Sequence, residues 1–195
     1  TDQQGVPLIT FNPDGKGGYR VTQSRYTRLG STAPAIQWGI PLCARRLTGK
    51  KQCQLLDQQS GSIRVPGRGA IVPNVGGTGY YRFELPAGEW DALIAKADKL
   101  PGGEALAFDD SLFASFQAGR ASAPQLVTGA VKLASNPDSY ASEAGIGSLA
   151  WFYRAGMLDE AGEEGYRALI RQIYAPKVKA MGFTPRAGAY ASEDP

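Results

Sequence analysis

Apolar and polar residues alternate along the first half of the chain, in short runs separated by Gly, Pro, Asn and Asp. In the segment "IQWGIPL", Ile36, Trp38, Ile40 and Leu42 recur with a period of two, so they share the face of a strand that points into a core. Pro41 makes this an edge or bulged strand. Such runs predict about seven strands, at 6–11, 19–26, 36–42, 51–56, 62–65, 70–72 and 80–85. Short strands at this close spacing are typical of a small antiparallel β-sandwich.

After Pro86 the apolar period becomes that of an α-helix. Trp90, Leu93, Ile94 and Ala97 would form one stripe of a first helix over 88–100. Similar patterns predict helices at 103–119, 122–134, 139–154 and 160–181. The inward positions would be Leu112, Phe113 and Phe116 in the second helix, Leu126, Val127, Ala130, Val131 and Ala134 in the third, and Tyr166, Leu169, Ile170, Ile173, Tyr174 and Val178 in the last. Helices joined by such short loops pack as antiparallel neighbours, as in an α-solenoid or superhelix.

Caps and breakers set the ends of these helices. Gly119 is placed to cap the second helix, and Ser122 with Pro124 opens the third. Pro176 should kink the last helix. The sequence therefore predicts a β-sandwich domain at 1–86 and a helical domain at 87–195. The polar stretch 184–195 resembles the approach to another helix, so the helical domain is expected to be the truncated start of a larger array.

The charge changes sign where the period changes. Residues 1–85 carry 11 Lys and Arg against 4 Asp and Glu, whereas residues 86–195 carry 10 against 14. The change supports two structural units that meet near Pro86. The cations of the basic half are scattered along the sequence, which favours solvated strand faces and hairpin tips over a nucleic-acid site. These scattered cations include Lys16, Arg20, Arg25, Arg28, Arg45, Arg46, Lys50 and Lys51.

Neither a membrane-spanning segment nor a targeting leader is visible in the sequence. Its longest apolar runs are far shorter than the roughly 20 residues that cross a bilayer. Thr1 stands where a start methionine is expected, and both ends are polar, which suggests a mature or excised piece.

Histidine is absent from the chain. This absence excludes a Ser-His-Asp or Cys-His catalytic arrangement and a histidine zinc cage, so Ser62 and Ser115 have no base to activate them. Two cysteines are too few for a zinc ribbon or an iron–sulfur cluster. We therefore expect no catalytic, cofactor-binding or metal-binding residue in this chain.

Cys43 and Cys53 flank a predicted hairpin tip at 47–49. They would fall opposite each other on neighbouring strands, where β-carbons stand about 4.5 to 5.5 Å apart, so a disulfide needs a modest local pinch. A bridge would favour an exported or periplasmic protein, whereas free thiols would leave the compartment open, including the cytoplasm.

Two other features suggest chemistry but have a structural explanation. The glycines of "NVGGTGYYRFEL", Asn74 to Leu85, precede a strand instead of a helix N-terminus, so they predict a loop and not a phosphate cradle. In that strand Tyr81, Phe83 and Leu85 would share one face and Glu84 would lie on the other. The adjacent carboxylates are expected to be solvated surface or first-turn helix charge. These pairs are Asp109-Asp110, Asp159-Glu160 and Glu163-Glu164.

The ordered set of motifs resembles the aminopeptidase N family of zinc aminopeptidases. "GVPLITF" and "YRVTQSRY" are similar to the opening strands of that family's β-sandwich, "IQWGIPL" to its Trp-x-Ile-Pro-Leu strand and "NVGGTGYYRFEL" to its closing strand. "EWDALI" and "ALAFDDSLFASFQAG" resemble the first two helices of its superhelix, and "YAPKVKAMGF" resembles a later segment. The resemblance runs from about residue 5 to residue 183.

This resemblance implies a non-catalytic C-terminal fragment. In the parent, zinc in a separate catalytic domain would activate water to remove N-terminal residues from peptides. The Gly-x-Met-Glu-Asn loop, the His-Glu-x-x-His motif and its downstream Glu are absent here. The sandwich would be a spacer and the helices a wall around the peptide substrate, with the catalytic domain as the partner.

Two other classes of function compete with this interpretation. A free-standing adhesion or carbohydrate-binding module would present Tyr19, Tyr26 and Trp38 as an exposed platform. The periodicity of Trp38 with Ile36 and Ile40 favours burial instead. A nucleic-acid binder would show an affinity that falls steeply with salt.

Overall fold

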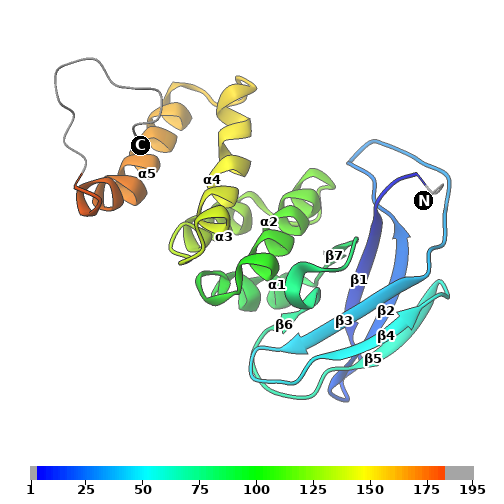
Figure 1. Cartoon of the computed structure of the whole chain (residues 1–195). Helices are drawn as coiled ribbons and strands as arrows, with labels where there is room; N and C mark the ends of the chain where they lie inside the picture. The colour runs from blue at the N-terminus through cyan, green and yellow to red at the C-terminus, as the bar shows by residue number, and fades with distance from the viewer. Residues whose placement is uncertain (1–3, 183–195) are drawn as a thin grey trace, which may run out of the picture.

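The computed structural model describes residues 4–182. Seven strands lie on one side of the molecule and five α-helices follow on the other, so the elements run in order from the sandwich into the helical array (Figure 1). This arrangement confirms the predicted β-sandwich followed by helices.

The strands form two sheets. The first, in the order β5-β2-β1-β7, contains β5 (Ser60–Arg64), β2 (Gly18–Arg25), β1 (Pro7–Pro13) and β7 (Arg82–Glu84). The second, in the order β4-β3-β6, contains β4 (Gln52–Leu56), β3 (Ile40–Arg46) and β6 (Ile71–Val72). The pairs are antiparallel except that β7 runs parallel to β1, with Ile9 opposite Phe83. The sandwich is therefore mixed at the edge that meets the helices.

Strand β3 lies four residues later in the chain than the predicted strand. It begins at Ile40, and the preceding Trp38 is bonded to a side chain instead of a strand. The backbone N–H of Trp38 donates to Oε1 of buried Gln23 at 2.8 Å, and Nε2 of Gln23 donates to the carbonyl of Trp38 at 2.9 Å. Pro41 lies at an edge, as predicted, because β6 reaches only Arg45 and Arg46 of β3.

The helices are α1 (Ala87–Ile94), α2 (Gly102–Gln117), α3 (Ala123–Leu133), α4 (Ser139–Arg154) and α5 (Glu160–Ala180). The predicted first helix is split, since a 3₁₀ turn η2 (Ala97–Lys99) follows α1. At this turn the carbonyls of Ala97 and Leu100 accept hydrogen bonds from the side chain of buried Asn136, at 3.0 and 2.9 Å. The predicted stripe of Trp90, Leu93, Ile94 and Ala97 is nevertheless buried.

The predicted caps of α2 and α3 are present. Gly119 has φ +72° just after α2, and Ser122 and Gln125 exchange side-chain and backbone hydrogen bonds in a capping box. Two inward assignments are wrong. Val127 is 42% exposed, because α3 packs through Leu126 and Ala130 and turns Val127 toward a groove. Val178 of α5 is 44% exposed. In α5 no side chain is fully buried, and Pro176 lies within the helix.

One continuous hydrophobic core joins the sandwich to the helices. It includes Ile9 and Phe11 of β1, Trp90 of α1 and Phe108 of α2, and extends to Leu149 of α4. The division of the chain at residue 86 stays a prediction, since apolar packing crosses that position without interruption.

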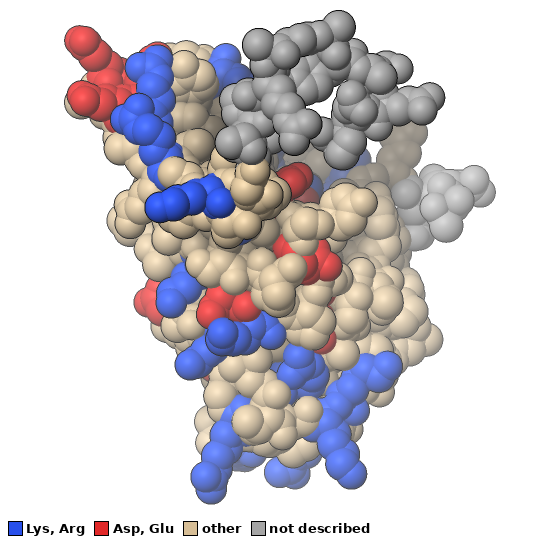
Figure 2. Space-filling view, turned by 60° about the vertical axis from the view of Figure 1, so that its left-hand side comes forward, with Lys and Arg blue, Asp and Glu red and all other residues tan. Residues whose placement is uncertain are grey.

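Charges are distributed unevenly over the surface. Lys and Arg side chains gather at the lower end of the molecule, where the tips of the sandwich hairpins lie, while the acidic side chains visible in the same view lie higher (Figure 2). Among residues 4–182, no helix combines the length and the apolar composition that a membrane crossing requires.

Candidate functional site at the joint between sandwich and helices

The joint between the β-sandwich and the helices is built around strand β7. Phe83 of β7 stacks on Trp90 of α1, with ring centroids 5.3 Å apart, and Trp90 meets the edge of Phe108 of α2 at 6.1 Å. All three rings are almost completely buried. Because each ring comes from a different element, they fix the angle at which the first two helices leave the sheet.

A buried carboxylate lies beside these rings. Glu84 is 8% exposed, and its Oε1 accepts hydrogen bonds from Trp90 Nε1 and Ser115 Oγ, both at 2.9 Å. Its Oε2 is buried and accepts no hydrogen bond from the described residues, although Arg120 Nη1 lies 3.8 Å away. The sequence pattern placed Glu84 on the face away from Phe83, and in the structure Trp90 of α1 and Ser115 of α2 contact its carboxylate.

A second polar contact joins β3 to the start of α2. The guanidinium of Arg45 binds Glu104 with two of its three nitrogens, Nε to Oε1 at 3.2 Å and Nη2 to Oε2 at 2.6 Å. Oε1 of Glu104 also accepts the backbone N–H of Gly76 at 3.1 Å. A bidentate pair of this kind, with one partner buried, holds the N-terminus of α2 against the second sheet.

The glycine-rich loop has the structural role that the sequence predicted. Gly77 has φ +66°, and a Cβ at this position would collide with the carbonyl oxygen of Gly103 in the first turn of α2. The side chain of Asn74 closes the loop by exchanging two hydrogen bonds with the backbone of Gly79, at 2.9 and 3.0 Å. The glycines therefore allow close approach of two backbones, and the loop leads into β7.

A third contact lies at the surface of the joint. Arg82 forms two hydrogen bonds with Asp110 of α2, at 2.9 and 2.8 Å, and its guanidinium lies over the ring of Tyr26 at 4.4 Å. The hydroxyl of Tyr26 donates to the carbonyl of Ala114 at 3.0 Å. Pairing with Asp110 raises the pKa of Arg82, so this cation stays charged and α2 is held at three points along its length.

The carboxylate pairs have different environments. Asp159 caps α5 by accepting the N–H of Gly162 at 2.8 Å, and Glu163 pairs with Arg167 one turn later, as first-turn and surface charges should. Asp109 does not fit the predicted solvated surface. It lies between α2 and α4, accepts a hydrogen bond from Ser148 Oγ at 3.1 Å, and burial, together with the nearby charge of Asp110, raises its pKa to about 6.

The predicted disulfide is present. Cys43 and Cys53 are paired across β3 and β4 and bridged, with a Cα–Cα distance of 4.1 Å. A structural bridge is typical of proteins that fold outside the cytoplasm and favours an exported location.

The aromatic platform of an adhesion module is not formed. Tyr19 is 0% exposed and donates its hydroxyl to Glu89, Tyr26 lies half-buried in the joint, and Trp38 packs partly buried against the core. Ser115 is engaged with Glu84, as described above. Ser62 lies exposed on β5.

The side chains of residues 4–182 do not fit a zinc site. Nowhere in this part of the chain do three Cys, Asp or Glu side chains come close enough together to hold a metal ion. The two cysteines are bonded to each other, so neither offers a thiolate.

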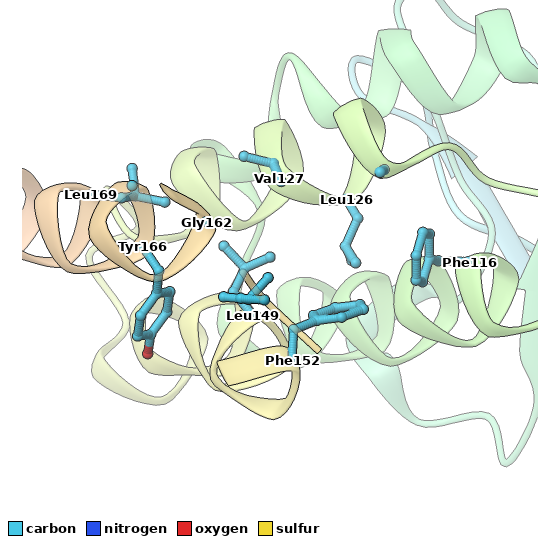
Figure 3. Close-up of a pocket in the computed structure, with 11 residues that line it drawn as sticks. Phe116, Leu126, Val127, Leu149, Phe152, Gly162, Tyr166 and Leu169 are labelled. Atoms are coloured by element: carbon cyan, nitrogen blue, oxygen red, sulfur yellow. The ribbon is translucent and has the colours of Figure 1, made fainter. Parts of the chain in front are cut away.

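An apolar groove of about 470 Å³ lies between α3, α4 and α5 (Figure 3). Val127 of α3 and Leu169 of α5 line one side, and Leu149 and Phe152 of α4 line the other. The groove exists because α5 packs less closely than the other helices, with its apolar residues only half-buried. The C-terminal half of α5 is held by Lys177, whose Nζ donates to the carbonyl of Ala134 and the hydroxyl of Ser142.

Comparison with known proteins identifies the helical part. The family model of the ERAP1-like C-terminal domain matches residues 70–194, which is well over half of the chain. A search among curated proteins gives no match. The match begins at β6 and includes β7, so the matched region joins the last strands of the sandwich to the helices. The chain therefore belongs to the family of the ERAP1-like C-terminal domain, a C-terminal region of aminopeptidase N-like enzymes, as its motifs predicted.

Proposed function

We propose that this chain is the non-catalytic C-terminal part of a zinc aminopeptidase, in which it sets the position of a helical wall relative to a separate catalytic domain. The observation that carries the proposal is the joint itself. Three aromatic rings, a buried carboxylate and a bidentate ion pair connect the sandwich to α1 and α2. A spacer has to transmit orientation, and a joint that is packed on several sides can do so.

In this proposal the parent removes N-terminal residues from peptides. The zinc ion and its ligands belong to the catalytic domain, where the metal would polarise the scissile carbonyl and activate water. The helices of this chain would limit access to that site, so that peptides enter and folded proteins do not. The disulfide favours a parent that is exported or periplasmic.

The proposal is tested first on the purified chain. We expect no hydrolysis of aminoacyl-coumarin substrates and no tightly bound zinc by atomic absorption after dialysis. Turnover of such a substrate, or one equivalent of retained zinc, would contradict a non-catalytic role.

The second test is the gene on the 5′ side of the Thr1 codon. We expect a His-Glu-x-x-His motif with a downstream Glu in the same open reading frame, a few hundred codons earlier. A start codon or a signal peptide directly before Thr1 would refute the proposed parent.

A further inference from the structure

Three connections of the sandwich meet at one end of the molecule. The turn between β1 and β2 lies beside the link that follows β5, since Gly18 pairs with Arg64. The tip of the β3–β4 hairpin is bonded to the same link, because Thr48 Oγ1 accepts the N–H of Arg68 at 3.0 Å and donates to the Arg68 carbonyl at 3.1 Å. Residues 14–17, 47–51 and 64–68 therefore form one continuous surface, here named the basic end.

The basic end carries six cations from segments that are far apart in the sequence. These cations are Lys16, Arg46, Lys50, Lys51, Arg64 and Arg68. Arg46 is engaged, since it donates to the carbonyl of Gly69 at 3.0 Å and lies 3.8 Å from Glu89. The side chains of the other five have no hydrogen bond or ion pair with any residue in 4–182. Figure 2 shows Lys and Arg gathered at this end.

The acidic groups at the basic end do not neutralise it. Asp14 accepts the backbone N–H groups of Lys16 and Gly18, at 2.7 and 2.9 Å, and these bonds lower its pKa. Glu89 accepts the hydroxyl of Tyr19 at 2.9 Å. Two carboxylates against six cations leave a strongly positive surface, which attracts anions and is screened by salt.

A hollow of about 460 Å³ lies within this surface. Arg46 and Arg64 line it, together with Gly17, Gln52 and Gly67. A guanidinium offers several N–H donors in one plane, so Arg64, whose side chain has no hydrogen bond or ion pair with residues 4–182, can bind a sulfate or carboxylate with two bonds. The five unpaired cations outnumber what one small anion would need. The surface thus fits a chain of anionic groups.

We infer that the basic end binds a sulfated polysaccharide, with one sulfated sugar in the hollow beside Arg64 and neighbouring sulfates on the surrounding lysines. A membrane surface fits less well, because none of the large apolar side chains exposed in residues 4–182 lies in these three segments. Single-stranded nucleic acid fits less well, because the same segments present no aromatic ring on which bases could stack. The disulfide also favours a location outside the cytoplasm.

The inference is tested by calorimetric titration of the whole chain with a heparin-derived octasaccharide. We expect binding that weakens as NaCl rises from 50 to 200 mM. The triple variant Lys50→Ser, Lys51→Ser, Arg64→Ser should raise the Kd about tenfold or more, since each lost cation reduces the attraction. These three side chains are exposed, so circular dichroism should show an unchanged fold.

The matched control removes the same charge elsewhere. The side chains of Arg28, Lys132 and Arg171 are exposed and have no hydrogen bond or ion pair within residues 4–182, and the variant Arg28→Ser, Lys132→Ser, Arg171→Ser should change the Kd less than about threefold. The single change Arg64→Lys keeps the charge but removes the planar fork, and it should weaken binding about threefold or more if Arg64 holds a sulfate.

Several results would overturn the inference. The control triple variant could lose as much affinity as the basic-end variant, or a desulfated octasaccharide could bind equally well. Equal or tighter binding of duplex DNA, of vesicles with 30% phosphatidylserine, or of poly-glutamate would assign the basic end to a different partner. Absence of measurable binding at 50 mM NaCl would remove the inference altogether.

Discussion

Trp90 offers the sharpest test of how the joint is held. Its indole ring lies between Phe83 and Phe108, and its N–H is one of only two donors to Oε1 of Glu84 among the described residues. The change Trp90→Phe keeps an aromatic ring but removes the donor. Glu84 would then rely on Ser115 and on a guanidinium 3.8 Å away.

The expected cost follows from two losses. A hydrogen bond to a buried charged group contributes about 1.5 to 3 kcal/mol. The smaller phenyl ring leaves a cavity in a core that is otherwise closed around Trp90, which costs about 1 kcal/mol. Trp90→Phe should therefore lower the free energy of unfolding by about 2.5 to 4 kcal/mol, a large part of the roughly 5 to 15 kcal/mol typical of a domain.

Urea unfolding followed by circular dichroism at 222 nm measures this difference. The control is Trp151→Phe, because Trp151 is 43% exposed and its indole N–H has no acceptor among the described residues. That variant should cost less than about 1 kcal/mol. If Trp90→Phe costs no more than Trp151→Phe, the polar network of Glu84 does not stabilise the joint and the reasoning fails.

Three further predictions concern other parts of the fold. Because burial raises the pKa of Asp109 to about 6, the folded protein holds this proton more tightly than the unfolded chain, so stability falls as pH rises from 4 to 7. Asp109→Asn should remove at most about 3 kcal/mol of this fall in the free energy of unfolding. Urea unfolding of both proteins at pH 4 and pH 7.5 measures it, and an equal pH dependence in variant and wild type would refute the prediction. Replacing Cys43 and Cys53 by Ala should lower the unfolding free energy by about 2 to 3 kcal/mol, and two titratable thiols in the unfolded, unreduced wild type would refute the bridge. Gly77→Ala should lower the melting temperature clearly more than Gly76→Ala, since both have positive φ but only a Cβ at Gly77 would collide with the backbone of α2; equal melting temperatures would refute the close approach.

Features set by local spacing were predictable from the sequence. The hairpin around 47–49 placed Cys43 opposite Cys53, because strand register follows directly from the position of the tip. The caps at Gly119 and Ser122 were also predictable, since helix ends select residue types for local reasons.

Features that depend on which elements cover a face were not predictable in the same way. Alternation placed Glu84 opposite Phe83, yet it could not show that α1 and α2 would bury the second face of β7. Asp109 was expected at the surface because two adjacent carboxylates suggest solvent, and only the packing of α4 on α2 covers it. The sequence did contain one signal. Trp90 and Ser115 on the helices are hydrogen-bond donors, and a buried donor needs an acceptor such as Glu84.

The clustering of cations at the basic end was also not predictable from the sequence. Its cations are scattered along the sequence, so the pattern indicated solvated strand faces. The fold gathers them because three connections of a sandwich end at the same side, which no periodicity within one segment can reveal.

The central claim is that the sandwich and the first helices form one rigid unit. Native-state hydrogen exchange at increasing urea tests it directly, by comparing the amide of Ile9 in β1 with that of Phe108 in α2. The account predicts that both amides open with the same free energy and the same dependence on urea, because one core contains both side chains. If the amide of Phe108 exchanges through a separate opening of lower free energy and smaller urea dependence, the helices unfold independently of the sandwich and the spacer role is contradicted.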